Sequence, residues 1–299
     1  MKDGAAQKLA WAVLAACAVA GCFWAHLHFS AQRAVRRVIE ERKDICARFG
    51  IETDGRSPFV ALLPMLPHED APARLGRDLF REPRLAKARN RMCVSCHPPN
   101  EGGTDGKVHG GQLTRPTLNA VFADRFLHDG SATGLASVIV RMIGDPAFCA
   151  ARSLSNAVER IAHQSAYAQR INTIYGERPS VSNVVYSIAQ YHKTMLTPQG
   201  PFDRFCAGAK DAIPPAAQAG AKVFERADCA SCHDGPTLGG RRFHEGRKVS
   251  NLRGLAQRRT YQAGGDVRTD LSAILAFMPG MDGISDEDRA ALIAFLRIL

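Results

Sequence analysis

The sequence predicts an all-α protein made of two domains of the same kind. Apolar residues recur at helical spacing through much of the chain, and the alternation that is typical of strands is scarce. The 299 residues are enough for two domains of ordinary size. The pattern Cys-x-x-Cys-His also occurs twice, at 93–97 and at 229–233, once in each half.

Each copy of this pattern is typical of covalent haem attachment, in which two thiols add to haem vinyl groups and the histidine ligates the iron. Zinc would need two further ligands near each pair, and a thioredoxin-like dithiol would need a βαβ context that the sequence lacks. We therefore predict two c-type cytochrome domains with one covalently bound haem c each. The predicted attachment residues are Cys93, Cys96, His97, Cys229, Cys232 and His233.

Residues 1–30 have the pattern of a signal or membrane anchor. The run 9–32 contains no Asp, Glu, Lys or Arg and is long enough to cross a bilayer. A cleaved signal peptide is an alternative, because residues 18–20 read Ala-Val-Ala. A lipoprotein with its lipid on Cys22 is a third. All three predict a periplasmic body, either tethered to the membrane or released, on the side where c-type haem is attached.

Basic residues gather in two stretches of a chain whose net charge is +10. Residues 31–69 are a predicted linker that begins with an amphipathic basic helix, which either lies on the membrane or is a solvated spacer. The second stretch, 241–268, is either a solvated surface that also neutralises haem propionates or a docking face for an acidic partner. Aromatic residues are not interleaved with these charges, which argues against nucleic acid as a partner.

The two haem domains are expected at 70–198 and 199–299, because Pro and Gly cluster at their junction. In the first domain, 155–176 predicts one helix that Gly176 ends, and 180–196 predicts another.

The last helix is expected within 285–299. Ser285 and Asp288 fit a loose capping box at its start. Its apolar stripe consists of Leu292, Phe295, Leu296 and Leu299.

Five segments around the motifs follow one another in a recognisable order. They are LGRDLFREPRL (75–85), RPTLNAVFADRFLHDGSA (115–132), GPFDRF (200–205), AGAKVFERADCASCHDGPTLGG (219–240) and KVSNLRGL (248–255). Together they resemble the bacterial di-haem cytochrome c peroxidase family, which includes the MauG-type enzymes. The resemblance covers roughly residues 70–299.

This resemblance implies that the first haem, ligated by His97, meets hydrogen peroxide and that the second, ligated by His233, passes electrons. His109 falls where typical members carry a loop histidine that caps the first iron until the other haem is reduced. It is therefore a candidate sixth ligand and gate, and the alternative is a solvated loop histidine.

The chain departs from the family pattern around the peroxide site. Phe148 stands where typical members have a catalytic Glu, so either peroxide turnover is slow or another group, such as Asp145 or His128, moves the proton instead. His128 also stands where the family has a Trp between the haems, and is either its replacement or a hydrogen-bonded core histidine. With Arg115, which begins its segment, His109 and His128 make up the candidate catalytic residues.

The second haem lacks the family's axial Met, because Gln262 falls at that position. Candidate iron ligands are Tyr261 and Gln262, and His244, Met278 or an open site are alternatives. A tyrosine ligand would be similar to the MauG type. Loss of the axial Met should lower the potential of this haem.

The family's calcium site between the domains uses residues just before this tyrosine. Arg258 and Arg259 occupy that region here, and their fixed positive charge argues against calcium, although Asn119 matches the family pattern.

Three functions remain in contention. The first is a peroxidase that reduces hydrogen peroxide with electrons from a small c-type cytochrome or a cupredoxin. The second is a MauG-like enzyme that uses peroxide to oxidise side chains of a protein substrate. The third is a membrane-tethered electron-transfer cytochrome.

Overall fold

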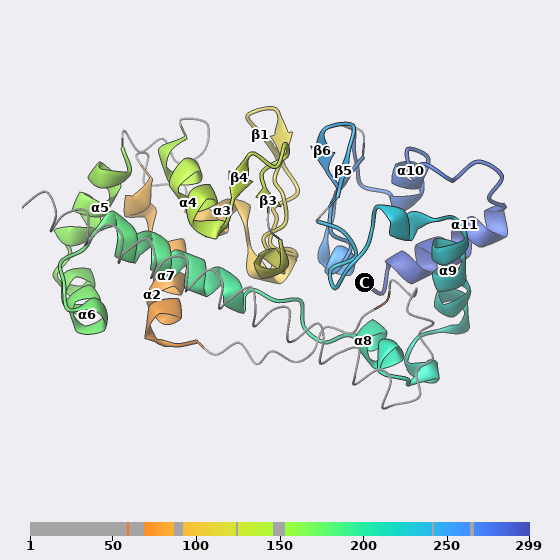
Figure 1. The fold of residues 1–299 in the computed structure, drawn as a ribbon, viewed down its shortest axis with the longest axis horizontal. Coiled ribbons are helices and arrows are strands. Elements are labelled where there is room, and N and C mark those ends of the chain that lie inside the picture. The colour runs from red at the N-terminus through yellow and green to blue at the C-terminus, as the bar shows by residue number, and fades with distance from the viewer. Residues whose placement is uncertain are drawn as a thin grey trace, which may run out of the picture. The chain divides into compact units, whose positions relative to one another are not determined.

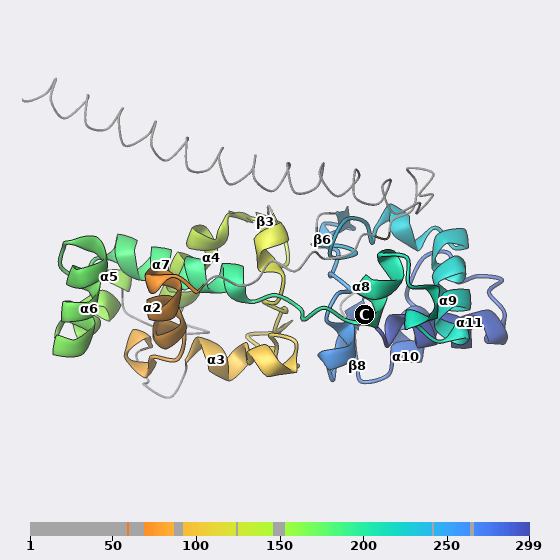
Figure 2. The same cartoon turned by 90° about the horizontal axis from the view of Figure 1, so that it is seen from below.

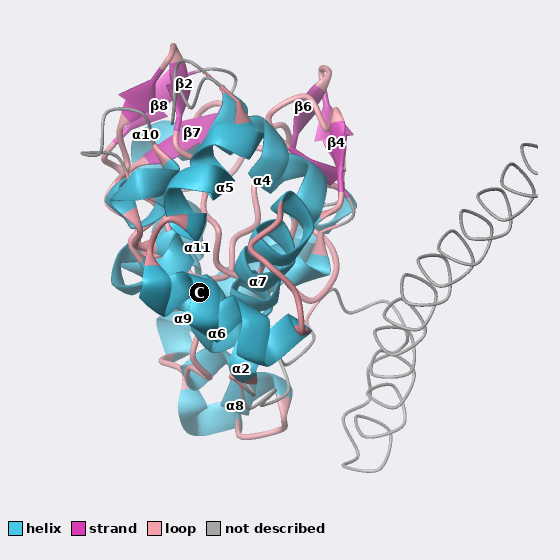
Figure 3. Ribbon diagram, turned by 90° about the vertical axis from the view of Figure 1, so that its left-hand side faces the viewer, coloured by secondary structure: helices cyan, strands magenta, loops and turns pink. Residues whose placement is uncertain are grey.

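The structure is a computed structural model that describes residues 59, 69–86, 92–123, 125–145, 153–240, 242–263 and 266–299. Helices dominate the described residues, as the sequence predicts (Figure 3). The expected anchor, the basic helix after it, Cys46, Phe148 and Cys149 lie outside the described residues. Within the described ranges, no helix combines the length and the apolar character that a membrane span requires.

The first domain is built on two helices that lie side by side, α2 (Ala71–Phe80) and α7 (Val181–Thr194) (Figures 1 and 2). They approach closely at Gly76, where an added Cβ would lie 1.9 Å from the Ser187 carbonyl oxygen. The core around them is apolar and contains Leu75, Leu79, Phe80, Ile139, Ile143, Ile161, Ile171, Val184 and Ile188.

Three further helices complete this domain: α4 (Leu135–Gly144), α5 (Leu154–Ala162) and α6 (Ser165–Tyr175). The single helix expected over 155–176 is therefore wrong. Gln164 takes the extended conformation φ −94°, ψ 109° and breaks it, which lets each half bury its own apolar side. The predicted stop is confirmed, because Gly176 ends α6 at φ 71°.

The second domain repeats this design with α9 (Pro215–Arg226) and α11 (Asp286–Leu296) as its paired helices. Gly220 lies at their crossing, where an added Cβ would lie 2.0 Å from the Ala291 carbonyl oxygen. The shorter helices α8 (Pro201–Cys206) and α10 (Leu271–Leu275) flank this pair. Buried here are Phe202, Cys206, Phe224, Leu255, Leu292, Phe295, Leu296 and Leu299, with Phe59 against the aromatic rings.

The last helix begins as predicted, since the Ser285 hydroxyl accepts from the Asp288 amide at 3.1 Å. The Asp288 carboxylate does not return to the Ser285 backbone. It accepts instead from the Arg226 guanidinium at 2.6 Å and so ties α11 to α9. The apolar stripe predicted for this helix is buried.

Four short antiparallel hairpins, which the sequence pattern did not predict, project from the loops of the described residues. They are β1 (Val108–His109) with β2 (Gln112–Leu113), β3 (Arg125–Phe126) with β4 (Ala132–Thr133), β5 (Phe243–His244) with β6 (Arg247–Lys248), and β7 (Tyr261–Ala263) with β8 (Asp266–Arg268). Short 3-10 turns lie at Pro83–Leu85, Pro99–Glu101, Ala120–Phe122, Lys210–Ala212, Cys229–Ser231 and Leu255–Gln257.

Candidate functional site

The first Cys-x-x-Cys-His motif forms a single helical turn that ends at its histidine. This turn, α3, spans Cys93–Cys96, and the His97 amide donates to the Cys93 carbonyl at 2.9 Å. His97 Nδ1 donates to the Gly103 carbonyl at 3.0 Å, so Nε2 is left for a metal. Burial lowers the pKa of His97 and keeps the ring neutral, which is the form that binds iron.

The second motif repeats this arrangement. Cys229 begins the 3-10 turn Cys229–Ser231 and Cys232 directly follows this turn. The His233 amide donates to the Cys229 carbonyl at 2.8 Å. His233 Nδ1 donates to the Leu238 carbonyl at 3.3 Å, and burial lowers the pKa of this ring as well. Each motif therefore presents one neutral imidazole nitrogen, oriented by a backbone carbonyl of the loop that follows.

A cavity of about 450 Å³ lies against the first motif. Residues of α4 and of the β3–β4 hairpin contribute much of its wall. Its apolar side chains include Leu113, Leu118, Phe122, Phe126, Leu135, Val138 and Met142. Its polar side chains include Arg115, His128, Arg141, Asp145 and His192.

A second cavity, of about 560 Å³, lies against the second motif. Its wall contains the apolar side chains Phe224, Leu252, Leu255, Leu271, Ile274, Leu275, Leu292 and Leu296. Sulfur and polar groups reach it from Tyr261, Gln262, Met278, Met281, His244 and Arg258.

The residues around both cavities fit haem c. Both volumes lie in the range of about 300–1,000 Å³ that is usual for small-molecule pockets. Burial raises the pKa of Cys229 to about 11, so its sulfur remains a thiol until it reacts. Arg258 Nε is buried without a hydrogen-bond partner among the described residues, and the side chain lines the second cavity. A haem propionate is an acceptor that would satisfy such a donor.

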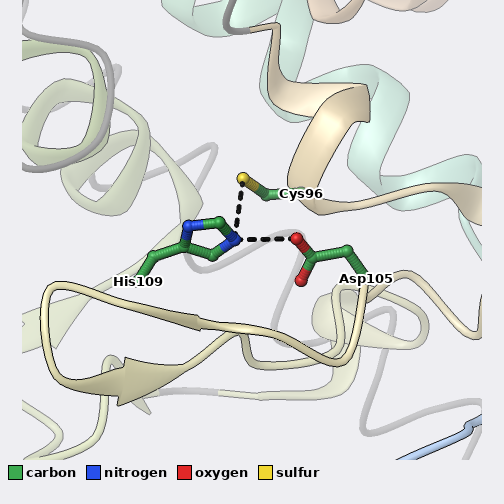
Figure 4. A group of neighbouring side chains, drawn as sticks. All are labelled: Cys96, Asp105 and His109. Carbon is green, nitrogen blue, oxygen red and sulfur yellow. Dashed lines mark hydrogen bonds and ion pairs between the residues drawn. The ribbon is translucent and has the colours of Figure 1, made fainter.

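The structure places His109 in a pair with Asp105, beside the first motif. His109 Nε2 lies 2.7 Å from Asp105 Oδ2 and 3.8 Å from Cys96 Sγ (Figure 4). These three ligand atoms lie within 4.8 Å of one another. Covalent attachment of haem would use the Cys96 sulfur, so the Asp105 carboxylate would remain as the partner of His109. His109 does not belong to the residues that line the first cavity.

Arg115 and His128 lie where the two cavities meet, because each side chain lines both. Arg115 donates through Nη1 to His128 Nδ1 at 3.5 Å and through Nη2 to the Lys248 carbonyl at 3.1 Å. The Lys248 amide in turn donates to the His128 carbonyl at 2.8 Å. Burial, and then the charge of Arg115, lower the pKa of His128, so this ring is neutral.

Tyr261 and Gln262 lie together on β7 and both line the second cavity. The Tyr261 hydroxyl donates to the Arg258 carbonyl at 3.2 Å. Met278 and His244 line the same cavity, so the structure brings all four predicted ligand candidates to one site.

Three residues of the site were not predicted from the sequence. His192 on α7 lines the first cavity and is buried, with Nδ1 2.9 Å from the Ile188 carbonyl oxygen. Met142 on α4 lines the same cavity. Met281 reaches the second cavity from the turn before α11. The only signal for His192 was a histidine on the apolar side of an expected helix.

Two family models match the chain in succession. Residues 70–211 match the di-haem cytochrome c peroxidase model, and residues 217–299 match the cytochrome c model. The chain is 29% identical over 215 residues to the cytochrome c peroxidase Ccp of Escherichia coli, covering 69% of this chain and 46% of that protein. It is also 29% identical over 206 residues to the methylamine utilization protein MauG of Methylorubrum extorquens, covering 65% of this chain and 57% of that protein. The chain thus spans about half the length of these relatives.

Solved structures share the fold. A MauG-like protein associated with microbial copper homeostasis superposes with a TM-score of 0.66 at 15% identity, covering 77% of this chain and 89% of that chain. The di-haem peroxidase BthA of Burkholderia thailandensis superposes with a TM-score of 0.61 at 17% identity, covering 76% of this chain and 85% of that chain.

Proposed function

Because residues 70–211 match the di-haem cytochrome c peroxidase model and residues 217–299 match the cytochrome c model, we propose that the chain is a di-haem peroxidase. It reduces hydrogen peroxide to water at the haem held by His97, with electrons delivered through the haem held by His233. The observation that carries this proposal is the pair of motifs, each with its own cavity and its own oriented histidine.

When bound, the haems supply the iron that cleaves peroxide and carries electrons. The chain's own residues connect the two sites. Arg115 and His128 line both cavities and are held to the second domain through Lys248. They would exclude water from the place where the two cavities meet and would hold the two cavities at a fixed separation.

The same two residues and Asp145 prepare the first cavity for peroxide. The Arg115 guanidinium donates to His128 Nδ1, which leaves the proton of the neutral ring on Nε2. His128 can therefore donate a hydrogen bond to a peroxide oxygen. The Asp145 carboxylate lines the same cavity and is the group that takes the peroxide proton and returns it to the departing oxygen.

Peroxide-dependent oxidation of a reduced small c-type cytochrome or cupredoxin tests this function. The haem-loaded chain should consume peroxide and donor in a ratio of one to two. Asp145→Asn should lower kcat by about 100-fold, the usual contribution of a positioned proton carrier. The matched control is Asp129→Asn, an exposed carboxylate on the rim of the same cavity. Unchanged turnover in the Asp145 variant would remove it from the mechanism.

A MauG-like oxidation of a partner protein is the second candidate, favoured by one observation. The strand β7 brings a tyrosine and an amide, and no methionine, to the second cavity. Stoichiometric peroxide added to the all-ferric protein separates the two functions. An immediate, long-lived change of the visible spectrum means stored oxidising equivalents and favours side-chain oxidation. A change only after half-reduction favours the peroxidase.

We place this activity in the periplasm, with the chain tethered or released at its N-terminus. The support is the pair of attachment motifs together with the apolar run at 9–32. Cell fractionation with haem staining tests this location, and haem-stained chain in the cytosol would contradict it.

A further inference from the structure

Arg258 is a buried cation whose hydrogen-bond partners are all neutral. Its Nη1 donates to the Asn251 carbonyl at 2.8 Å. Its Nη2 donates to Asn251 Oδ1 at 3.1 Å and to the Arg253 carbonyl at 2.8 Å. Its Nε has no partner among the described residues. The side chain lines the second cavity, so the charge faces that space.

Arg115 lies half-buried at the meeting point of the two cavities and also lacks a charged partner among the described residues. Its hydrogen-bond partners, the Lys248 carbonyl and the His128 ring, are also neutral. Burial lowers the pKa of Arg115 to about 10. Burial first, and then the charge of Arg115, lower the pKa of Arg258 to about 10. Both side chains line the second cavity, so two like charges face the same space.

Arg253 is a buried arginine of the same domain whose charge is matched by a carboxylate. Its Nη2 donates to Asp203 Oδ1 at 2.8 Å, and both side chains are under 5% exposed. No described carboxylate forms such an ion pair with Arg115 or Arg258. A buried guanidinium and a half-buried one that face the same cavity without an anion are costly, so that cavity must receive an anion.

We infer that Arg115 and Arg258 form a two-arginine clamp for haem propionates, with Arg258 serving the haem of His233 and Arg115 serving both haems. This assignment rests on the two haems of the proposed function. It follows from the lining of the cavities, because Arg258 lines only the second and Arg115 lines both. Guanidinium groups bind carboxylates through two parallel hydrogen bonds, and a propionate would also satisfy Arg258 Nε.

The clamp has a measurable consequence for reduction. A ferrous haem carries one more negative charge than a ferric haem, so a buried cation beside it stabilises the reduced form. Arg258 should therefore raise the reduction potential of the second haem, and Arg115 should raise the potentials of both. Substitution of Arg258 and substitution of Arg115 should therefore change different sets of haem potentials in the same titration.

Spectroelectrochemical titration of the purified, haem-loaded chain tests this inference without peroxide. Arg258→Gln should lower the ferrous-to-ferric ratio of the second haem about tenfold at a fixed applied potential, or ~59 mV for one electron, and leave the first haem unchanged. Arg115→Gln should lower both. His233→Gly, which displaces only the second wave, assigns the two haems.

The matched control is Arg259→Gln, which removes the same charge one residue along the chain at an exposed position. Arg259→Gln should shift neither haem potential by more than a small fraction of the shift expected for Arg258→Gln. Arg258→Lys should keep most of the potential that Arg258→Gln loses. Equal shifts in Arg258→Gln and Arg259→Gln, or no shift in either clamp variant, would overturn the clamp. If the clamp variants shift the two potentials as expected but the chain does not turn over peroxide, the proposed function is wrong and the clamp is still supported.

Discussion

The carbonyl group that orients His97 belongs to Gly103, at a position that only glycine fits. Gly103 has φ +72°, and a Cβ there would lie 2.7 Å from Thr117 Oγ1 and 2.8 Å from the Leu118 amide nitrogen. The loop after the first motif can therefore turn back to the histidine only because this residue has no side chain.

Gly103→Ala should lower the free energy of unfolding by about 3 kcal/mol, from the left-handed backbone and the clash together. It should also shift the visible spectrum of the first haem, because the His97 ring loses its fixed orientation. The control is Gly111→Ala at φ +79°, with no atom within 4 Å of an added Cβ. It should cost only the backbone strain, about 1–2 kcal/mol. Chemical denaturation of both variants measures the difference, and equal losses would contradict the crowding argument.

His192 makes the stability of the first domain depend on pH. Burial lowers the pKa of His192 to about 4, whereas an exposed histidine titrates near ~6.5. Between these values the unfolded chain binds a proton that the folded chain does not. The stabilisation is therefore complete above ~6.5 and is lost as the pH falls towards 4, by up to about 3 kcal/mol.

His192→Gln should flatten this dependence, because an amide can keep the hydrogen bond to the Ile188 carbonyl without taking a proton. Denaturant unfolding at about pH 7 and about pH 5 measures the change in unfolding free energy. His163→Gln, at an exposed histidine 3.6 Å from Glu159, is the control and should leave the slope intact. A slope that survives in the His192 variant would mean that another group takes up the proton.

These residues also show what a sequence can predict about the site. The attachment motifs were predicted because haem chemistry demands a fixed local spacing. His192, Met142 and Met281 were not, since each reaches its cavity from an element distant from the motif. The reach of Arg115 and Arg258 into the cavities depends equally on tertiary packing, which local patterns do not encode.

In both domains, a glycine at the crossing point lets the two paired helices pack closely. Gly76 lets α2 meet α7, and Gly220 lets α9 meet α11, each against a backbone carbonyl of its partner helix. A backbone carbonyl cannot move aside as a flexible side chain would, so the fit at each crossing depends on the missing methyl group.

Gly76→Ala and Gly220→Ala should each destabilise their domain by about 2 kcal/mol, although alanine is the better helix former by about 1 kcal/mol. Gly144→Ala isolates the propensity term, since an added Cβ at the end of α4 meets nothing within 4 Å. That variant should be neutral or more stable. Thermal unfolding followed by circular dichroism measures all three, and a stabilised Gly76 variant would show that the helices can move apart.

At the level of elements, periodicity predicted the helices well and their interruptions poorly. The apolar stripe of α5 continues into α6, so nothing in the spacing marks the break at Gln164. The hairpins were missed because their strands are too short for alternation to register. Two of the turns did carry a signal in the sequence, because glycine occurs in both. The turn residues Gly110, Gly111, Glu245 and Gly246 all have positive φ, and each pair joins two strands of two residues.

Contacts between the halves involve backbone groups of both. Besides the Lys248–His128 contact, the Thr260 hydroxyl donates to the Gly106 carbonyl at 3.0 Å, and the Lys248 ammonium donates to the Arg125 carbonyl. The Asn119 side chain exchanges hydrogen bonds with Thr197 in the connection between the domains. None of these contacts between described residues uses a carboxylate.

Removal of calcium should therefore have no effect on the whole molecule. Treatment with a calcium chelator is expected to leave both haem potentials and the thermal midpoint unchanged, because the guanidinium of Arg258 repels a divalent cation in this region. Calorimetry with added calcium chloride is the complementary measurement. A potential that falls on chelation and recovers with calcium would contradict this expectation.

The two-arginine clamp has a consequence for how the protein is made. A newly made chain would have to bring two guanidinium groups of like charge to one cavity before any anion is there to meet them, so its compact state is disfavoured until haem binds. Haem binding and folding would then be coupled, and a chain without haem would be more open to proteolysis. The two arginines would in this way make stable folding depend on haem binding.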